Sequence, residues 1–276
     1  MTAVLAISVR EGVVLTTDSR TTIQLGDEPK QFQTFDNVQK VFRLHPELPI
    51  AVMTWGLNQL GDATIAELIK EAGDRLAGQS PKHKDWELDS EDADLEPVAE
   101  RVTNFLFHDH YQPISEKLPD VANCTLHFAG FSSGKRRPEQ AEAVLMKDHI
   151  QGPRHLVNNA VQVNYTGTYT ARIMGAMDPR VLPVFEKAGF EAEKAQRATR
   201  KITSESLRRL LHPSMPLIEV ARLSRNLMNT EIALTQFGPE PDVVGGGIQM
   251  AVISRDKCRL KQYPVEHFAI RPEGPN

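Results

Sequence analysis

The chain has 276 residues, of which 40% are hydrophobic and 25% are charged, and its formal net charge is −4. This composition is typical of a globular protein, and the length allows one large domain or two small ones. Acidic and basic residues are mixed, so no basic stripe indicates nucleic-acid binding, and no apolar run reaches the roughly 18 residues of a membrane span.

The number of cysteines and the first residues of the chain indicate the cellular compartment. Cys124 and Cys258 are far apart and show no metal-ligand spacing, and so few cysteines are typical of a reducing compartment. No charged segment precedes a long apolar run, so a signal peptide is not expected. We therefore predict a cytoplasmic protein with no metal or other cofactor and with no nucleic-acid or membrane partner.

The first 22 residues predict a β-hairpin. Two apolar runs rich in β-branched residues, 4–9 and 13–17, flank a short polar turn that contains Gly12. Thr2 follows the initial methionine directly. If Met1 is removed, Thr2 carries a hydroxyl and a free α-amino group, which makes it a candidate nucleophile with its own base. Taken alone, a threonine near a chain end is more simply explained as a small residue, so the rest of the chain decides.

Further along the chain, strands and helices follow one another in groups. We expect an irregular polar stretch over 24–37, strands over 38–44 and 50–55, a helix from Gly56 to about Gly78, a charged loop over 79–93 and a helix over 96–117. Strands are then expected over 123–129, 141–147, 155–158 and 161–166, helices between 169 and 236 with one beginning near Pro216, and strands over 248–254 and 259–267. This order fits an α+β fold of two stacked antiparallel sheets with helix pairs on both outer faces, a four-layer αββα sandwich.

Five short motifs follow Thr2 in the order found in one known superfamily. Thr2 is followed by Gly12-Val13-Val14-Leu15 and by Asp18-Ser19-Arg20-Thr21-Thr22, and Lys40 precedes Val41-Phe42. Gly56 follows the strand 50–55, and Asp242-Val243-Val244-Gly245 precedes the last strands. The chain thus resembles the β-type subunits of the proteasome superfamily, which includes HslV and the Anbu proteins. These are N-terminal-nucleophile hydrolases of αββα fold that assemble into rings or related oligomers.

The resemblance implies a set of roles. The catalytic residues would be Thr2, Asp18, Lys40 and Gly56, with Arg20, Asp242 and Gly245 in support. The α-amine of Thr2, with an ordinary pKa near 8, would accept the hydroxyl proton, and Lys40 would act as a cation held by Asp18. The Gly56 amide, expected at a helix start, would stabilise an oxyanion, a contribution of roughly 3–4 kcal/mol in other enzymes.

Each of these residues also has a plainer explanation. Asp18 and Arg20 could form a structural ion pair only, Lys40 could be a solvated lysine at a strand edge, and Gly56 could be a turn glycine. Two serines of the family are also missing: Gly245 replaces one, and no serine lies near residues 151–153, where the other is expected. A water molecule or Asp242 could substitute for them, and Tyr165 and Thr166 are other candidate donors.

Motif position also implies a substrate pocket. Its lining would be Thr21, Val38, Thr54 and Asn58, which are medium-sized and uncharged and predict no strong preference for acidic or basic side chains. Residues 79–93 and about 180–214 exceed the family plan. We therefore predict a single domain over residues 1–276 with insertions at these two places.

The leading functional hypothesis is a threonine peptidase that cleaves peptides or unfolded polypeptides inside a self-assembled oligomeric chamber. Ring peptidases often work with an ATP-dependent unfoldase, although no residue here identifies one. Two alternatives remain open: a small-molecule amidase with the same nucleophile, and a catalytically inactive ring or scaffold subunit, which the missing serines favour. The N-terminal residue of the mature chain would separate these hypotheses best.

Overall fold

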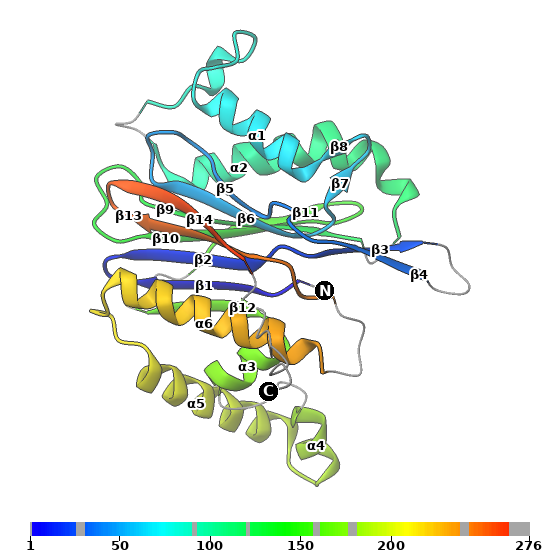
Figure 1. Cartoon of the computed structure of the whole chain (residues 1–276), viewed down its shortest axis with the longest axis vertical. Coiled ribbons are helices and arrows are strands. Elements are labelled where there is room, and N and C mark those ends of the chain that lie inside the picture. Colours follow the sequence, from blue (N-terminus) through cyan, green and yellow to red (C-terminus); the bar gives the residue numbers. More distant parts are fainter. Residues whose placement is uncertain are drawn as a thin grey trace, which may run out of the picture.

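The structure is a computed structural model that describes residues 2–25, 31–89, 93–119, 122–156, 161–175, 181–237 and 243–264. Helices flank two five-stranded antiparallel sheets, and two smaller two-stranded sheets complete the described part of the chain (Figure 1). The predicted α+β class with antiparallel sheets is confirmed, and the arrangement is compatible with the expected sandwich.

The first sheet contains the N-terminal hairpin. Its strand order is β12-β1-β2-β13-β14, and the strands span Gln162–Thr166, Val4–Val9, Gly12–Asp18, Ile248–Ser254 and Lys257–Tyr263. In the predicted hairpin, Val9 pairs with Gly12 and Val4 pairs with Thr17. Every residue of β1 and β2 is buried. Both faces of this hairpin are therefore covered, which explains why its apolar runs are continuous rather than alternating.

The second sheet is built from the middle of the chain. Its strand order is β11-β10-β9-β6-β5, and the strands span Ile150–His155, Glu139–Leu145, Cys124–Gly130, Ile50–Gly56 and Val41–Arg43. Strand β6 pairs with both β5 and β9, so it lies inside the sheet, and its end at Gly56 pairs with Cys124 of β9.

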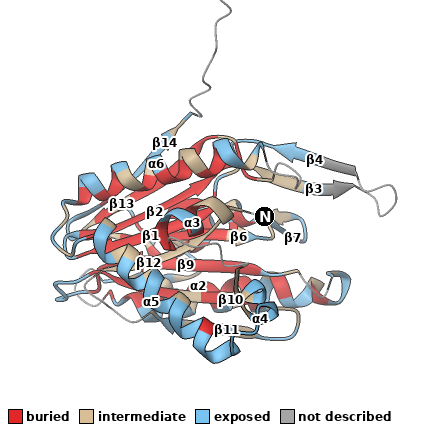
Figure 2. Ribbon diagram, turned by 90° about the horizontal axis from the view of Figure 1, so that it is seen from below, coloured by how far each residue is buried: buried red, intermediate tan, exposed pale blue. Residues whose placement is uncertain are grey.

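Alternation along β1 shows how the sheets pack. Val4 and Ala6 lie in a cluster with Met53 and Ala129 of the second sheet, whereas Leu5 and Ile7 pack towards the helices below. Those helices are α3 (Thr168–Gly175) and α6 (Leu217–Thr235), and α1 (Ile65–Leu76) and α2 (Leu95–Phe105) cover the second sheet (Figure 1). Figure 2 colours residues by burial: strands β1 and β2 are red because they are buried, and helix α5 is mostly pale blue because it is exposed.

Two sequence predictions in the first third of the chain are wrong. The stretch 24–37 was expected to be irregular, but strands β3 (Thr21–Leu25) and β4 (Gln31–Phe35) pair antiparallel and project from the sheets (Figure 2), while residues 26–30 lie outside the described residues. The polar residues here are interleaved with Ile, Thr and Phe, which suit a strand. Helix α1 begins at Ile65 and not at Gly56, after the short strands β7 (Gln59–Leu60) and β8 (Ala63–Thr64).

Local chemistry explains the late start of α1. Thr64 accepts a hydrogen bond from the Glu67 amide, and the Glu67 side chain accepts one from the Thr64 amide, which is a capping box. Gly56 and Gly61 have φ of 97° and 61°, outside the helical region. The apolar period seen in the sequence is real, but it belongs to residues 65–76.

The remaining helices follow the predicted ranges with changes in type. Helix α2 continues as a π-helical turn over Leu106–Tyr111 and a 3-10 helix over Gln112–Lys117, which fills the predicted range 96–117. In the two predicted insertions lie the 3-10 helix Lys84–Trp86 and the exposed helices α4 (Leu182–Lys187) and α5 (Ala192–Leu210). None of the helices in the described ranges is both long and apolar enough to cross a membrane.

Candidate active site

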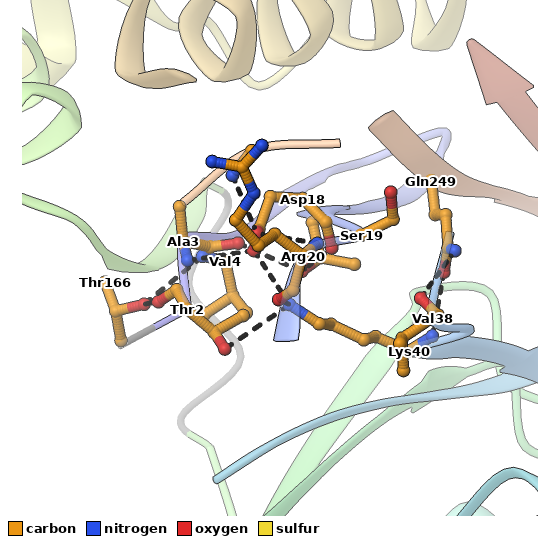
Figure 3. A network of polar contacts seen from close by, with 12 residues as sticks. Thr2, Ala3, Val4, Asp18, Ser19, Arg20, Val38, Lys40, Thr166 and Gln249 are labelled. Carbon is orange, nitrogen blue, oxygen red and sulfur yellow. Dashed lines mark hydrogen bonds and ion pairs between the residues drawn. The ribbon is translucent and has the colours of Figure 1, made fainter. Parts of the chain in front are cut away.

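Thr2, Asp18 and Lys40 meet in one network of polar contacts (Figure 3), and Gly56 lines the same cavity as Thr2 and Lys40. Thr2 lies just before β1 and Asp18 ends β2, so hairpin pairing places them side by side. Lys40 lies just before β5 of the second sheet, and Gly56 ends β6. The structure therefore brings the four predicted catalytic residues to the same end of the fold, from both sheets.

Asp18 is fully buried and surrounded by donors. One carboxylate oxygen accepts hydrogen bonds from the Ala3 amide (3.2 Å) and from Lys40 Nζ (3.1 Å), and the other accepts from the amides of Arg20 (3.1 Å) and Gly245 (3.2 Å). Burial raises the pKa of Asp18, although the Lys40 ammonium and the amides of Gly245 and Arg20 act in the opposite direction. Because every contact is a donor, the surroundings suit the ionised carboxylate.

Lys40 carries the charge that faces Asp18. Its Nζ donates to Asp18 Oδ1 (3.1 Å), to the Arg20 carbonyl (2.5 Å) and to Thr2 Oγ1 (3.4 Å). Three acceptors match the three N–H groups of an ammonium. Burial lowers the pKa of Lys40 from its ordinary value, and the charge of Asp18 opposes that shift. The Lys40 side chain is only 8% exposed, so its ion pair with Asp18 is shielded from water.

Gln249 holds the backbone around Lys40 and was missed in the sequence. Its side-chain oxygen accepts from the Lys40 amide (2.8 Å), and its side-chain nitrogen donates to the Val38 carbonyl (2.8 Å). The residue lies in β13 between Ile248 and Met250, which are buried. The signal in the sequence was a glutamine within an otherwise apolar strand, which suggests a polar contact. The sequence does not show which backbone groups this glutamine contacts.

Thr166 supplies the hydroxyl that contacts the backbone of Thr2. Its Oγ1 donates to the Thr2 carbonyl (2.7 Å) and accepts from the Val4 amide (3.2 Å). The sequence placed the missing family serine near residues 151–153 and offered Thr166 only as one of several alternative donors. That segment lies in β11, where a Cβ on Gly152 would meet the backbone of Glu142. The hydroxyl beside Thr2 thus comes from the end of β12 and not from β11.

A cavity of about 270 Å³ opens beside Thr2. Lys40 and Gly56 line it, as do the four residues expected in the substrate pocket: Thr21, Val38, Thr54 and Asn58. The sequence did not single out six further lining residues: Gln39, Trp55, Leu57, Thr64, Ile65 and Ala66. The described residues of the walls include no acidic side chain, and Lys40 is the cation among them, so an uncharged substrate side chain suits this cavity.

Gly56 occupies a position that no other residue fits. Its φ is 97°, and a Cβ there would lie 2.2 Å from the carbonyl oxygen of Asn123. The expectation that Gly56 opens a helix is wrong, because α1 starts nine residues later, at Ile65. The amide therefore has no helix dipole behind it, and any oxyanion stabilisation must come from its own N–H group.

Arg20 occupies the space next to Gly245. Its guanidinium pairs with Asp36 (Nε to Oδ1, 2.8 Å), and this hydrogen bond lowers the pKa of Asp36. A Cβ on Gly245 would lie only 2.6 Å from Arg20 Cζ. The side chain of a serine at position 245 therefore has no room while Arg20 keeps this place. Asp242, also expected in support, lies outside the described residues.

Replacing Gly245 by serine is expected to destabilise the protein by about 1–3 kcal/mol, because overpacking must displace the Arg20 guanidinium. Thermal unfolding would register this as a lower midpoint. The same substitution made together with Arg20→Ala should cost less than it does alone, since the obstructing group is gone. Equal costs in the two backgrounds would contradict the steric explanation.

The site combines a hydroxyl, a buried ion pair and a lined cavity, and it offers no metal centre. Within the described ranges, no three His, Cys, Asp or Glu side chains form a group that could hold a metal ion. Both described cysteines are buried and free. Comparison of the chain with protein-family models finds no match, and comparison with curated proteins finds no significant one.

Proposed function

We propose that the protein is a threonine peptidase of the N-terminal-nucleophile class. The observation that carries the proposal is the contact of Thr2 Oγ1 with Lys40 Nζ (3.4 Å), beside a cavity and backed by the buried carboxylate of Asp18. A threonine hydroxyl needs a base and a nearby positive charge to become a useful nucleophile. This arrangement supplies the charge, and removal of Met1 would supply the base.

The reaction would proceed through an acyl-enzyme. The free α-amine of Thr2 accepts the hydroxyl proton while Oγ1 attacks the carbonyl carbon of the substrate amide. Lys40 lowers the energy of the developing alkoxide by its charge, and the Gly56 amide is the proposed oxyanion donor. The α-ammonium then returns the proton to the leaving nitrogen, the C–N bond breaks and an ester on Thr2 remains. Water cleaves that ester and regenerates the hydroxyl.

The stacked layers of the fold and the resemblance of the sequence to the proteasome superfamily together support the finer assignment of the fold, the four-layer αββα sandwich of N-terminal-nucleophile hydrolases.

Self-assembly into a ring or related oligomer is part of the proposal. It is supported by apolar side chains on and just after α6 that water reaches, namely Ile218, Leu234 and Phe237. Light scattering of the purified protein would measure the particle mass, and a monomer at micromolar concentration would contradict assembly.

Intact-mass measurement of the purified protein tests the proposal first. We expect a mass that lacks Met1, because a retained methionine would leave no free amine on Thr2. A threonine-directed epoxyketone should then label Thr2, since that reagent reacts with both the hydroxyl and the α-amine. Cleavage of unfolded polypeptide, in addition to small acylated amines, would separate a peptidase from a small-molecule amidase.

A non-catalytic subunit is the second candidate, and one observation favours it. The guanidinium of Arg20 fills the space beside Gly245, where the family carries a serine close to the terminal amine. Without that hydroxyl, proton transfer at the amine lacks one partner. Absence of epoxyketone labelling on a chain shown to lack Met1 would support this candidate over the peptidase.

The pH dependence of hydrolysis should be bell-shaped. Activity is expected to rise as the α-amine of Thr2 loses its proton, near its ordinary pKa of about 8 or below it because of the Lys40 charge. It should fall again as Lys40 becomes neutral, and burial places that pKa below the ordinary value of 10.5. Measuring kcat/KM from pH 6 to 10.5 tests this. A profile that keeps rising throughout would contradict the need for a charged Lys40.

A further inference from the structure

A second cavity, also of about 270 Å³, lies between the two sheets on the other side of Trp55. Strands β1 and β12 bound it from the first sheet, and β6, β9 and β10 bound it from the second. Trp55 lines both cavities, and Thr166, whose hydroxyl contacts the Thr2 carbonyl, lines the second one. Thr2 and its neighbours thus stand between two separate binding spaces.

His127 gives the second cavity an unusual polar wall. The imidazole is completely buried, and its Nε2 lies 2.8 Å from Gln140 Oε1. The same oxygen accepts from Asn164 Nδ2 (3.4 Å), across the gap between the sheets. With the Gln140 amide oriented so that Oε1 faces the ring, Nε2 of His127 is the donor and carries the imidazole proton. In the neutral ring, Nδ1 then carries a lone pair and can only accept a hydrogen bond.

That lone pair faces a second acceptor. Nδ1 of His127 lies 3.6 Å from Glu142 Oε2 and has no hydrogen-bond partner within the described ranges. Arg154 contacts the other oxygen, Oε1 (3.0 Å), and lies largely in solvent. An acceptor nitrogen that is fully buried and unpaired within the described ranges needs a donor beside it, and Glu142 Oε2 lies close enough to accept from the same donor.

We propose that this cavity binds a positively charged group of the substrate, on the leaving-group side of the scissile bond. Among the described residues that line this cavity, Glu142 is the only carboxylate and none is a lysine or an arginine, and the Trp55 ring offers a cation–π surface. An ammonium or guanidinium group would donate to Glu142 Oε2 and His127 Nδ1, which satisfies both acceptors.

The direction of binding rests on the proposed function. The acyl part of the substrate takes the first cavity with Gly56, so the departing amine must leave past Thr166 and Trp55. Glu142 lies two strands away from β6, since it pairs with His127 and His127 pairs with Met53. At about 4.8 Å per strand the two strand backbones are roughly 10 Å apart, a distance that a lysine or arginine side chain next to the scissile bond and the Glu142 side chain can span together.

Matched peptides test the proposal directly. Peptides that differ only in lysine or norleucine after the scissile bond should show about a tenfold preference for lysine in kcat/KM, the size expected for one charge-assisted contact. Glu142→Gln should reduce that ratio to near one. Asp148→Asn removes the same charge from the exposed turn between β10 and β11, and it should keep the ratio. No preference in the wild type, or the same preference in Glu142→Gln, would overturn the proposal.

A binding measurement separates this inference from the peptidase assignment. The chain has two tryptophans, so Trp86→Phe leaves Trp55 as the fluorescent reporter at the cavity. With Thr2→Ala added to prevent turnover, lysyl-alanine amide should give a saturable fluorescence change, and norleucyl-alanine amide should give none.

Saturable binding without Thr2-dependent cleavage would refute the peptidase and retain the subsite. Cleavage with equal responses to the two ligands would refute the subsite and retain the peptidase. Neither titration requires a change at Glu142, so the test holds even if Glu142→Gln does not fold.

Discussion

Replacing Thr2 by alanine is expected to lower peptide hydrolysis by at least about a thousandfold, to the background of the assay. Removal of a nucleophile eliminates the acyl-enzyme route, and such losses reach about a millionfold in other hydrolases. The substitution should leave stability nearly unchanged. Within the described residues, the Thr2 hydroxyl contacts the Lys40 side chain, at 3.4 Å. The hydrogen bond from Thr166 goes to the backbone carbonyl of Thr2, which alanine retains.

Steady-state hydrolysis and thermal unfolding, measured on the same preparations, would check both parts of this expectation. Thr2→Ser is the matched control, because it retains a hydroxyl on the same atom and should retain activity. Full activity in Thr2→Ala would remove Thr2 from the mechanism altogether. A large fall in the unfolding midpoint would show instead that the threonine has a structural role.

Lys40→Met is expected to have the second-largest effect, with losses in both activity and stability. Methionine keeps an unbranched side chain but leaves Asp18 buried without its countercharge, which typically costs about 3–5 kcal/mol. Hydrolysis should fall by at least about a hundredfold, because the charge next to Thr2 Oγ1 is lost. Denaturant unfolding and kcat/KM measure the two losses separately.

The double variant Asp18→Asn with Lys40→Met separates the structural and catalytic contributions. Both charges are removed together, so no buried charge remains unpaired and much of the stability should return. Activity should not return, because the catalytic cation is still missing. A double variant that regains hydrolysis would show that the ion pair acts only by holding the fold together.

Local patterns explain why part of the site could be predicted. The β1–β2 hairpin is specified by its own apolar runs and turn, so Thr2 and Asp18 meet through neighbouring register. Gly56 could be placed at the end of a strand because the run 50–55 is apolar and bounded by a glycine. The helical period over 65–76 was also visible, but a capping box at Thr64 fixed its start more firmly than the glycine did.

The rest of the site depends on contacts that no local pattern encodes. Gln249 reaches the backbone of Lys40 across 209 positions, and Thr166 reaches that of Thr2 across 164. The guanidinium of Arg20 takes its place because Gly245 has no side chain, which can be recognised only once both loops are positioned. The polar wall around His127 likewise arises from two sheets packed face to face.

The donors around Asp18 also determine when the site can form. One of them, the Gly245 amide, lies 227 positions away, and Gln249, which fixes the Lys40 backbone, belongs to the same late segment. A chain still being synthesised has the threonine, the aspartate and the lysine for most of its elongation, but it lacks the strand that orders them. Long-range contacts of this kind form late in folding. Hydrolytic capacity would therefore appear only when β13 docks beside β2, and a chain truncated before Gly245 would be a harmless precursor.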